Sequence, residues 1–329
     1  MPLAERPRVD LVETRPILPE ERAKRQKAQG LFEDWLKMKF GVSLGQVLDL
    51  GAVSASRFLA EFAQYLYDTG GAQWVVTEAI LAVTDKNRSW RRSMTLAWDA
   101  VIMWKELTPA TSHRPLPFTL LWALVGLAAV WGWKDIALIL LLGFAGMLRR
   151  GEVFSLRRRD LISGARLGAG QESLFVAIGR PKMRRMGVRR QHVKITEPFL
   201  IWFLRYGFPG WHHDGAIFGG KPAEATKALE ALCRFFRVPS SDGVGITWAS
   251  LRGGGATHRY QVGQPLDRIL WVGRWATTRT LECYVQEHAA DSFVQDLPTL
   301  ARERIAFFAD HARNLLVEAV TASVATDAA

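Results

Sequence analysis

The 329-residue chain contains little cysteine, since Cys233 and Cys283 are its two thiols. Two cysteines are too few for a disulfide framework or for a cysteine cage around a metal, and such scarcity is typical of proteins from a reducing compartment. A lone thiol in a helical segment is more often a packing residue than a nucleophile. We therefore expect no cross-links, no metal site and an intracellular location.

Long apolar segments are also lacking. The most apolar stretches, residues 118–133 and 136–148, each fall short of the ~20 residues that a bilayer requires. Lys134 and Asp135 separate them, and an arginine-rich segment follows the second. The pattern predicts two buried helices of a globular domain rather than membrane spans.

Acidic residues are scarce relative to basic ones, because 32 Asp and Glu against 43 Lys and Arg give a net charge of +11. The segment from residue 149 to residue 194 contains thirteen basic and three acidic residues. A basic chain fits a polyanionic partner, although ribosomal and membrane-surface proteins are basic too, and a charged run is often only a solvated face. Charge alone leaves nucleic-acid binding and a solvated surface as open alternatives.

The spacing of apolar residues predicts two folded regions. Residues 1–29 mix charges with prolines and lack the apolar core of a secretory signal, which predicts a flexible arm. Residues 30–112 have the spacing of four or five amphipathic helices, and the turn formers of residues 113–117 predict a linker. A second domain then covers residues 118–312, and residues 313–329 form a C-terminal tail.

The apolar spacing changes inside the second domain. Residues 174–178 and 191–195 have the pattern of short strands. The segment between them is rich in Lys and Arg, so the two strands would form a hairpin with a long basic tip. The predicted fold is mainly α, with a small antiparallel β-sheet or hairpin in the second domain.

Arg149, Arg252 and Tyr284 form a set that suits the cleavage of a phosphodiester. Such cleavage builds negative charge on the phosphorus oxygens, and an arginine fork stays charged and can bind two oxygens at once. Tyrosine has an ordinary pKa near ~10, and nearby cations favour its ionised, nucleophilic form. Attack by Tyr284 would leave a covalent phosphotyrosine that retains the bond energy. Rejoining then needs no ATP, metal or other cofactor.

The motifs around these residues resemble those of the tyrosine recombinase, or phage integrase, family. Each motif is weak alone, but their order and spacing together are specific. The resemblance covers about residues 32–287 and implies an N-terminal helical, SAM-like core-binding domain followed by an α-rich catalytic domain. The motifs are Gly146-Met147-Leu148-Arg149-Arg150-Gly151-Glu152, Ser250-Leu251-Arg252-Gly253-Gly254, and Gly273-Arg274-Trp275 with Tyr284 nine residues after the tryptophan.

The resemblance also implies a role for each matching residue. Arg149 and Arg252 match the two arginines that bind the phosphate, and Glu152 would orient Arg149. Trp275 occupies a position held by histidine or tryptophan, whose ring nitrogen donates to the phosphate. Tyr284 matches the nucleophile.

The basic hairpin tip adds a further expected role. Lys182 follows Pro181 and matches the lysine that protonates the leaving 5′-oxygen, while contact with backbone phosphates is the alternative. Other contacts with double-stranded DNA are expected from basic residues of the helical domain and of the hairpin. These residues are Lys86, Arg88, Arg91, Arg92, Arg180, Arg184, Arg185, Arg189 and Arg190.

One position departs from the family pattern. The family usually has histidine three residues before the second arginine, and this chain has Ala249. Alanine can neither bond a phosphate oxygen nor accept a proton, and the loss of one such donor typically costs ~10²- to 10³-fold in rate. Trp248 and His258 are the nearby side chains that could compensate.

Three functions follow from these observations. The leading one is a site-specific DNA recombinase or integrase that acts as a homotetramer on DNA, is a monomer or weak oligomer when free, and has no membrane partner. The second is a recombinase-derived DNA-binding protein that cuts slowly or not at all because of Ala249. The third is an enzyme like a type IB topoisomerase, which relaxes supercoils without pairing sites. The helical segment of residues 291–319 would dock on a neighbouring protomer or pack on its own domain.

Overall fold

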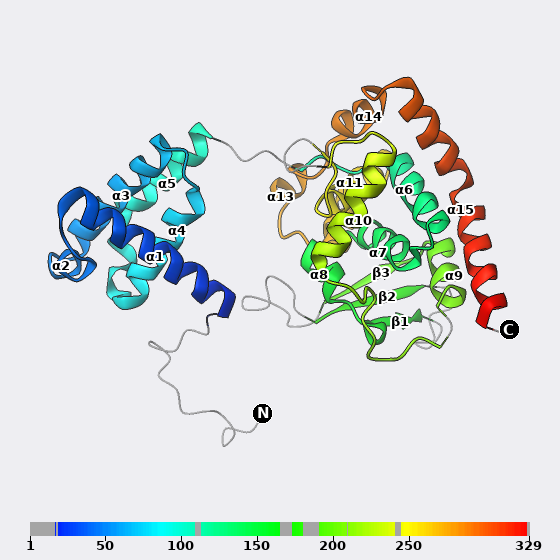
Figure 1. The fold of residues 1–329 in the computed structure, drawn as a ribbon, viewed down its shortest axis with the longest axis horizontal. Coiled ribbons are helices and arrows are strands. Elements are labelled where there is room, and N and C mark those ends of the chain that lie inside the picture. Colours follow the sequence, from blue (N-terminus) through cyan, green and yellow to red (C-terminus); the bar gives the residue numbers. More distant parts are fainter. Residues whose placement is uncertain are drawn as a thin grey trace, which may run out of the picture. The chain divides into compact units, whose positions relative to one another are not determined.

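Two units of unequal size make up the fold, and they divide between Ala110 and Thr111 (Figure 1). Each unit has a hydrophobic core of its own. The computed structural model describes residues 17, 19–108, 113–164, 173–179, 191–208, 210–240 and 245–327, with side chains up to residue 322.

The first unit consists of helices packed around an aromatic core. Phe62 of α3 lies between two side chains of α1, with its ring centroid 5.2 Å from Phe32 and 5.3 Å from Trp35. All three side chains are almost fully buried. The helical spacing predicted for this region is therefore correct. The described elements are α1 (Pro19–Phe40), α2 (Leu44–Asp49), α3 (Ala52–Asp68), α4 (Gln73–Lys86), the 3-10 helix η2 (Arg88–Arg92) and α5 (Thr95–Leu107).

Helix α1 begins earlier than the sequence predicted. Pro19 lies at its start, where the missing N–H costs nothing, and two glutamates follow it at the positive end of the helix dipole. Arg25 is buried and pairs with Glu78 at 3.2 Å and with Asp85. The flexible arm predicted for residues 1–29 is therefore wrong for residues 19–29, because charges taken as solvated form ion pairs. Residues 1–16 lie outside the described residues.

The second unit combines helices with a small sheet. The sheet has the order β1-β2-β3 and is antiparallel, with Val176 opposite Leu161 on one side and Val193 on the other. The elements are α6 (Phe118–Val130), α7 (Lys134–Ala145), α8 (Arg150–Ser155), η3 (Arg158–Asp160), β1 (Leu161–Ser163), β2 (Leu174–Ile178), β3 (Gln191–Ile195), α9 (Pro198–Tyr206), α10 (Pro222–Phe235), α11 (Ser250–Gln261), α12 (Leu266–Gly273), α13 (Thr278–Glu282), α14 (Glu287–Gln295) and α15 (Thr299–Asp327).

The two strands predicted from the sequence are β2 and β3, and their pairing as a hairpin is confirmed. Strand β1 was not predicted, because it has only three residues and follows a charged segment. The fold is mainly helical with a small antiparallel sheet, as the sequence predicted.

The apolar segments that precede the basic run form α6 and α7. Most of their residues are fully buried in the core of the second unit. Within the described part of the chain, every helix is too short or too polar to cross a membrane. The prediction of two buried helices is therefore correct.

Helix α15 is part of the second unit rather than a separate tail. It runs along α6 in this unit (Figure 1), and Leu316 and Val320 are buried in the core. The tail predicted for residues 313–329 is therefore wrong up to Val320, because apolar side chains spaced four residues apart continue the buried face of the helix. Of the two placements considered for this helix, the structure shows packing on its own domain.

The segment predicted as a linker, residues 113–117, also belongs to the second unit. Leu116 is 1% exposed, and its backbone N–H donates to the carbonyl oxygen of Ser250 at 3.0 Å. The approach is so close that a Cβ on Gly254 would lie 2.2 Å from the Leu116 carbonyl oxygen. The prolines that indicated a linker instead keep residues 113–117 extended along α11, and we call this segment the strap.

Alanine substitutions on α11 test this close packing. We expect Gly254→Ala to lower the free energy of unfolding by ~2 kcal/mol, because the new Cβ would overlap the Leu116 backbone. Gly253→Ala is the matched control, since its Cβ would meet nothing nearer than 3.6 Å, and alanine favours a helix by up to ~1 kcal/mol over glycine. Urea denaturation followed by tryptophan fluorescence measures both variants. Equal stability of the two would contradict the packing described.

Candidate active site

Three segments that are far apart in the sequence meet in the second unit. They are the turn between α7 and α8, helix α11, and residues 273–284, which run from the end of α12 through α13. An apolar cluster with members from all three segments holds them together. Its buried members are Met147, Ala256, Ile269, Trp275 and Leu281.

Arg149 and Glu152 are joined at the start of α8. The Glu152 carboxylate accepts from the backbone N–H of Arg149 at 2.8 Å and from its Nη1 at 2.9 Å. Glu152 is 6% exposed, whereas 28% of the Arg149 side chain is exposed. The carboxylate therefore fixes the guanidinium from the interior and leaves part of it open to an anion from outside.

Arg252 of α11 is buried beside this pair. Its Nη2 donates to the Gly273 carbonyl oxygen at 2.6 Å and its Nη1 to the Met147 carbonyl oxygen. Met147 has a positive φ of 46°, which is uncommon for a residue with a side chain. Burial, and then the nearby Arg149 and Arg274, lower the pKa of Arg252 to about 10. Arg252 therefore remains charged at neutral pH.

Two aromatic rings cover the Arg252 guanidinium. Its Cζ lies 4.1 Å from the ring centroid of Trp275 and 5.6 Å from that of Tyr284, and the two rings are 5.1 Å apart. Tyr284 is half-buried, and its carbonyl oxygen accepts from Thr257 Oγ1 of α11 at 3.0 Å. The tyrosine ring therefore lies beside Arg252 of its own chain.

Arg274 is a further charged residue of this cluster. Its Nη2 donates to Glu152 Oε2 at 2.7 Å, and its side chain is 7% exposed. Its backbone is left-handed, with φ 58° and ψ 42°. Burial lowers the pKa of Arg274, Glu152 partly opposes that shift, and Arg149 adds to it. Glu152 thus binds two arginines at once.

Lys182 and the hairpin arginines Arg180, Arg184, Arg185, Arg189 and Arg190 lie outside the described residues. The last described residue before them, Gly179, lines a cavity of about 400 Å³ together with Glu152. The end of β2 therefore lies next to Glu152 of the arginine cluster. In the first unit, Lys86, Arg91 and Arg92 are exposed at the end of α4 and on η2, and Arg88 is half-buried.

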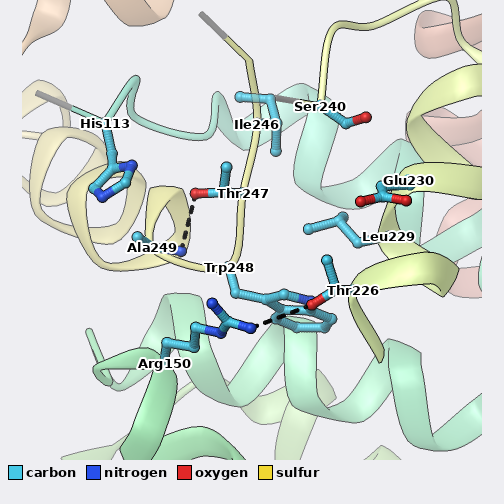
Figure 2. Close-up of a pocket in the computed structure, with 10 residues that line it drawn as sticks. All are labelled: His113, Arg150, Thr226, Leu229, Glu230, Ser240, Ile246, Thr247, Trp248 and Ala249. Carbon is cyan, nitrogen blue, oxygen red and sulfur yellow. Dashed lines mark hydrogen bonds between the residues drawn. The ribbon is translucent and has the colours of Figure 1, made fainter. Parts of the chain in front are cut away.

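Ala249 lines a second cavity, of about 460 Å³, at the start of α11. Figure 2 shows Ala249 next to His113, with Leu229 and Glu230 on the opposite side of the cavity. The Arg150 Nη2 lies 3.4 Å from Thr226 Oγ1, and the Ala249 N–H donates to Thr247 Oγ1 at 3.3 Å. The side chain at position 249 thus supplies no polar group to this cavity.

Of the two side chains considered as substitutes for a histidine at 249, Trp248 lines the same cavity as Ala249, whereas His258 lines a different one. The ring of Trp248 lies 5.2 Å from that of Phe154 and is buried. His258 is stacked on Phe118, with centroids 3.9 Å apart, and burial followed by Arg259 lowers its pKa. The ring contacts of both residues are packing contacts, and the buried Nε1 of Trp248 has no hydrogen-bond partner among the described residues.

Comparison with known proteins rests on structure. No protein-family model and no curated protein matches this sequence. The XerH site-specific recombinase, in a post-cleavage complex with a palindromic difH substrate, matches with a TM-score of 0.50 and 14% identity, over 81% of this chain and 75% of that one. The chain has the tyrosine recombinase fold. A pre-cleavage XerH complex has a TM-score of 0.48, with 15% identity over 83% and 78% of the two chains. The Tn1549 transposon integrase with circular intermediate DNA has a TM-score of 0.47, with 12% identity over 80% and 98%.

Within this tyrosine recombinase fold, the structure brings together Arg149, Glu152, Arg252, Trp275 and Tyr284, all of which the sequence singled out. The sequence reasoning missed Arg274. The one sequence signal for Arg274 was its position between the glycine and the tryptophan of the third motif. Residue spacing does not reveal that this arginine adopts the left-handed backbone conformation.

Removing the charge of Glu152 tests its part in the cluster. We expect Glu152→Gln to lower the free energy of unfolding by ~3 kcal/mol, because breaking a buried ion pair leaves charge uncompensated. Glu224→Gln is the control, since Glu224 also caps a helix but is exposed, and its loss should cost ~1 kcal/mol or less. Thermal and urea unfolding of both variants provide the measurement. A Glu152→Gln protein as stable as Glu224→Gln would show that the carboxylate is not needed to hold the arginines.

Proposed function

We propose that this protein is a site-specific DNA strand transferase that cleaves and rejoins DNA through a 3′-phosphotyrosine on Tyr284. The observation that carries the proposal is the contact of the Tyr284 ring with the Arg252 guanidinium, 5.6 Å from ring centroid to Cζ. A phosphate bound by Arg252 would therefore lie within reach of a tyrosine of the same chain. The tyrosine recombinase fold supports this assignment.

The charges of the cluster fit the reaction. Three arginines and one carboxylate leave it with an excess of positive charge. A phosphodiester has one negative charge and gains more as the attacking oxygen bonds to phosphorus. Guanidinium groups already fixed by Glu152 and by backbone carbonyls need little reorganisation to stabilise that charge.

The proposed reaction is balanced without a cofactor. The Tyr284 hydroxyl gives its proton to solvent water as its oxygen bonds to phosphorus, the bond from phosphorus to the 5′-oxygen breaks, and the 3′-phosphate stays on the tyrosine. Lys182 is proposed to give a proton to the leaving 5′-oxygen. Its support is that Gly179, three residues earlier, shares a cavity with Glu152. A 5′-hydroxyl, from the same or another strand, reverses the step and releases Tyr284.

Double-stranded DNA is the proposed partner, bound by a homotetramer in which each protomer cuts one strand. Its support is the basic run of residues 149–194, with thirteen basic and three acidic residues, and the exposed Lys86, Arg91 and Arg92 of the first unit. Basic side chains of this kind bind the phosphate backbone of DNA without reading its sequence.

A second candidate is a DNA-binding protein that does not cut. It is favoured by Ala249, which offers only a methyl group where the family usually has a histidine. A third, topoisomerase-like function shares the covalent step and would relax a supercoiled plasmid without pairing two sites.

Covalent trapping separates these candidates. Wild type, Tyr284→Phe and Tyr260→Phe are each mixed with a random pool of nicked duplexes, denatured, and examined for attached DNA. We expect attachment by wild type and by Tyr260→Phe, the control at an exposed tyrosine of α11, and none by Tyr284→Phe, which should bind DNA as wild type does. Tight binding by wild type with no covalent product would favour the non-cutting protein.

The salt dependence of binding tests the basic hairpin. We expect the double variant Arg184→Ala, Arg185→Ala to reduce the slope of log K against log salt by about 2, because each phosphate contact contributes ~0.9 for duplex DNA. Fluorescence anisotropy with a labelled duplex at several salt concentrations gives the slope. Arg302→Ala on α15 is the control, and a slope unchanged in both variants would place the DNA contacts elsewhere.

A further inference from the structure

We propose that Arg274 is a third arginine that contacts the scissile phosphate directly. The inference rests on the proposed function, because it assigns a phosphate to this cluster. It is carried by the position of Arg274 and by its unpartnered nitrogen atoms.

Arg274 is connected to both other arginines of the cluster. It shares the Glu152 carboxylate with Arg149, at 2.7 Å from Arg274 Nη2 and 2.9 Å from Arg149 Nη1. It approaches the Met147 carbonyl oxygen at 3.5 Å, the same oxygen that accepts from Arg252. Glu152 and the Met147 carbonyl oxygen therefore link the three guanidinium groups into one cluster.

The donors of these arginines are not all used. Arg274 Nε, Arg274 Nη1 and Arg252 Nε are buried and have no hydrogen-bond partner among the described residues. Trp35, Ser173 and Trp248 each have one such atom, so half of these unusual atoms belong to two neighbouring arginines. A buried donor without a partner is costly. A phosphate group has enough acceptor oxygens to satisfy several at once.

The backbone of Arg274 supports the same conclusion. Its φ of 58° is one that a glycine adopts at no steric cost and that an arginine adopts with strain. The C-terminus of α12 would accept glycine at this position more easily. An arginine at this position can pair with Glu152, because its side chain points toward that carboxylate.

The proposal also accounts for a cutting enzyme with alanine at position 249. Arg274 adds a permanent cation to the arginine cluster, whereas Ala249 offers only a methyl group to the cavity that it lines. A histidine would have to be protonated to give that charge, whereas arginine stays charged across the physiological pH range.

Single-turnover cleavage of a nicked duplex, obtained from covalent trapping, tests the proposal. We expect Arg274→Ala to reduce the cleavage rate ~10²- to 10³-fold with DNA affinity within about fivefold of wild type. Arg259→Ala is the matched control, since Arg259 is another buried arginine, bonded to Gln264 and to the Ala145 carbonyl outside the cluster. Its rate should be that of wild type for the folded fraction. Equal rates in Arg274→Ala and wild type would overturn the proposal.

A pH profile separates phosphate contact from a structural role. In Arg274→His, the rate relative to wild type should fall at least tenfold as pH rises from 5.5 to 8, because imidazolium loses its charge through its ordinary pKa near ~6.5. A residue that only supports the fold would give a ratio independent of pH, and that result would also overturn the proposal.

Inorganic phosphate provides a readout that does not need cleavage. The melting temperature of wild type and of Arg259→Ala should rise with phosphate, relative to chloride at equal ionic strength, and the rise should be lost in Arg274→Ala. If wild type fails to cleave but shows this difference, the proposed function is wrong and the phosphate contact stands. If wild type cleaves and all three proteins respond equally to phosphate, Arg274 does not contact the phosphate.

Discussion

The buried Glu152 carboxylate is the interaction on which this site depends. Arginine side chains repel one another, and a cluster of them can be held inside a protein only if acceptors compensate their charge. Glu152 accepts from the Arg149 backbone and side chain and from Arg274. The Met147 and Gly273 carbonyl oxygens do the same for Arg252. The cluster keeps a net positive charge and is thus prepared for an anion.

The surrounding fold brings these acceptors into place by close backbone approach. Gly254 lets the strap before α6 lie against α11, so that the helix carrying Arg252 is fixed. At Gly273, a Cβ would lie 1.7 Å from the Trp275 ring, so glycine there lets the ring cover the Arg252 guanidinium. Met147 and Arg274 both have positive φ, and such strain is commonly found at functional sites. The strained backbone at Met147 and Arg274 lowers local stability, and it places the groups that hold the Arg252 and Arg274 guanidinium groups.

Much of this could be predicted from the sequence, but not all. The strands β2 and β3 and the buried α6 and α7 follow from apolar patterns that local residues determine. The start of α1 was missed because the ion pairs of Arg25 form with a distant helix, which a local reading of charge cannot show. The motifs identified residues that the structure brings together, yet Arg274 required the backbone conformation to be known. The role of Lys182 stays a prediction.

Mass spectrometry of the trapped complex tests the central claim most directly. Wild-type protein joined to DNA is digested with nuclease and protease, and the peptide that retains a nucleotide is sequenced. We expect a 3′-linked nucleotide on Tyr284. The thiol of the neighbouring Cys283 is exposed and is therefore an alternative nucleophile that the sequenced peptide distinguishes from Tyr284. A nucleotide on Cys283, or on a residue away from the arginine cluster, would contradict the role of Tyr284.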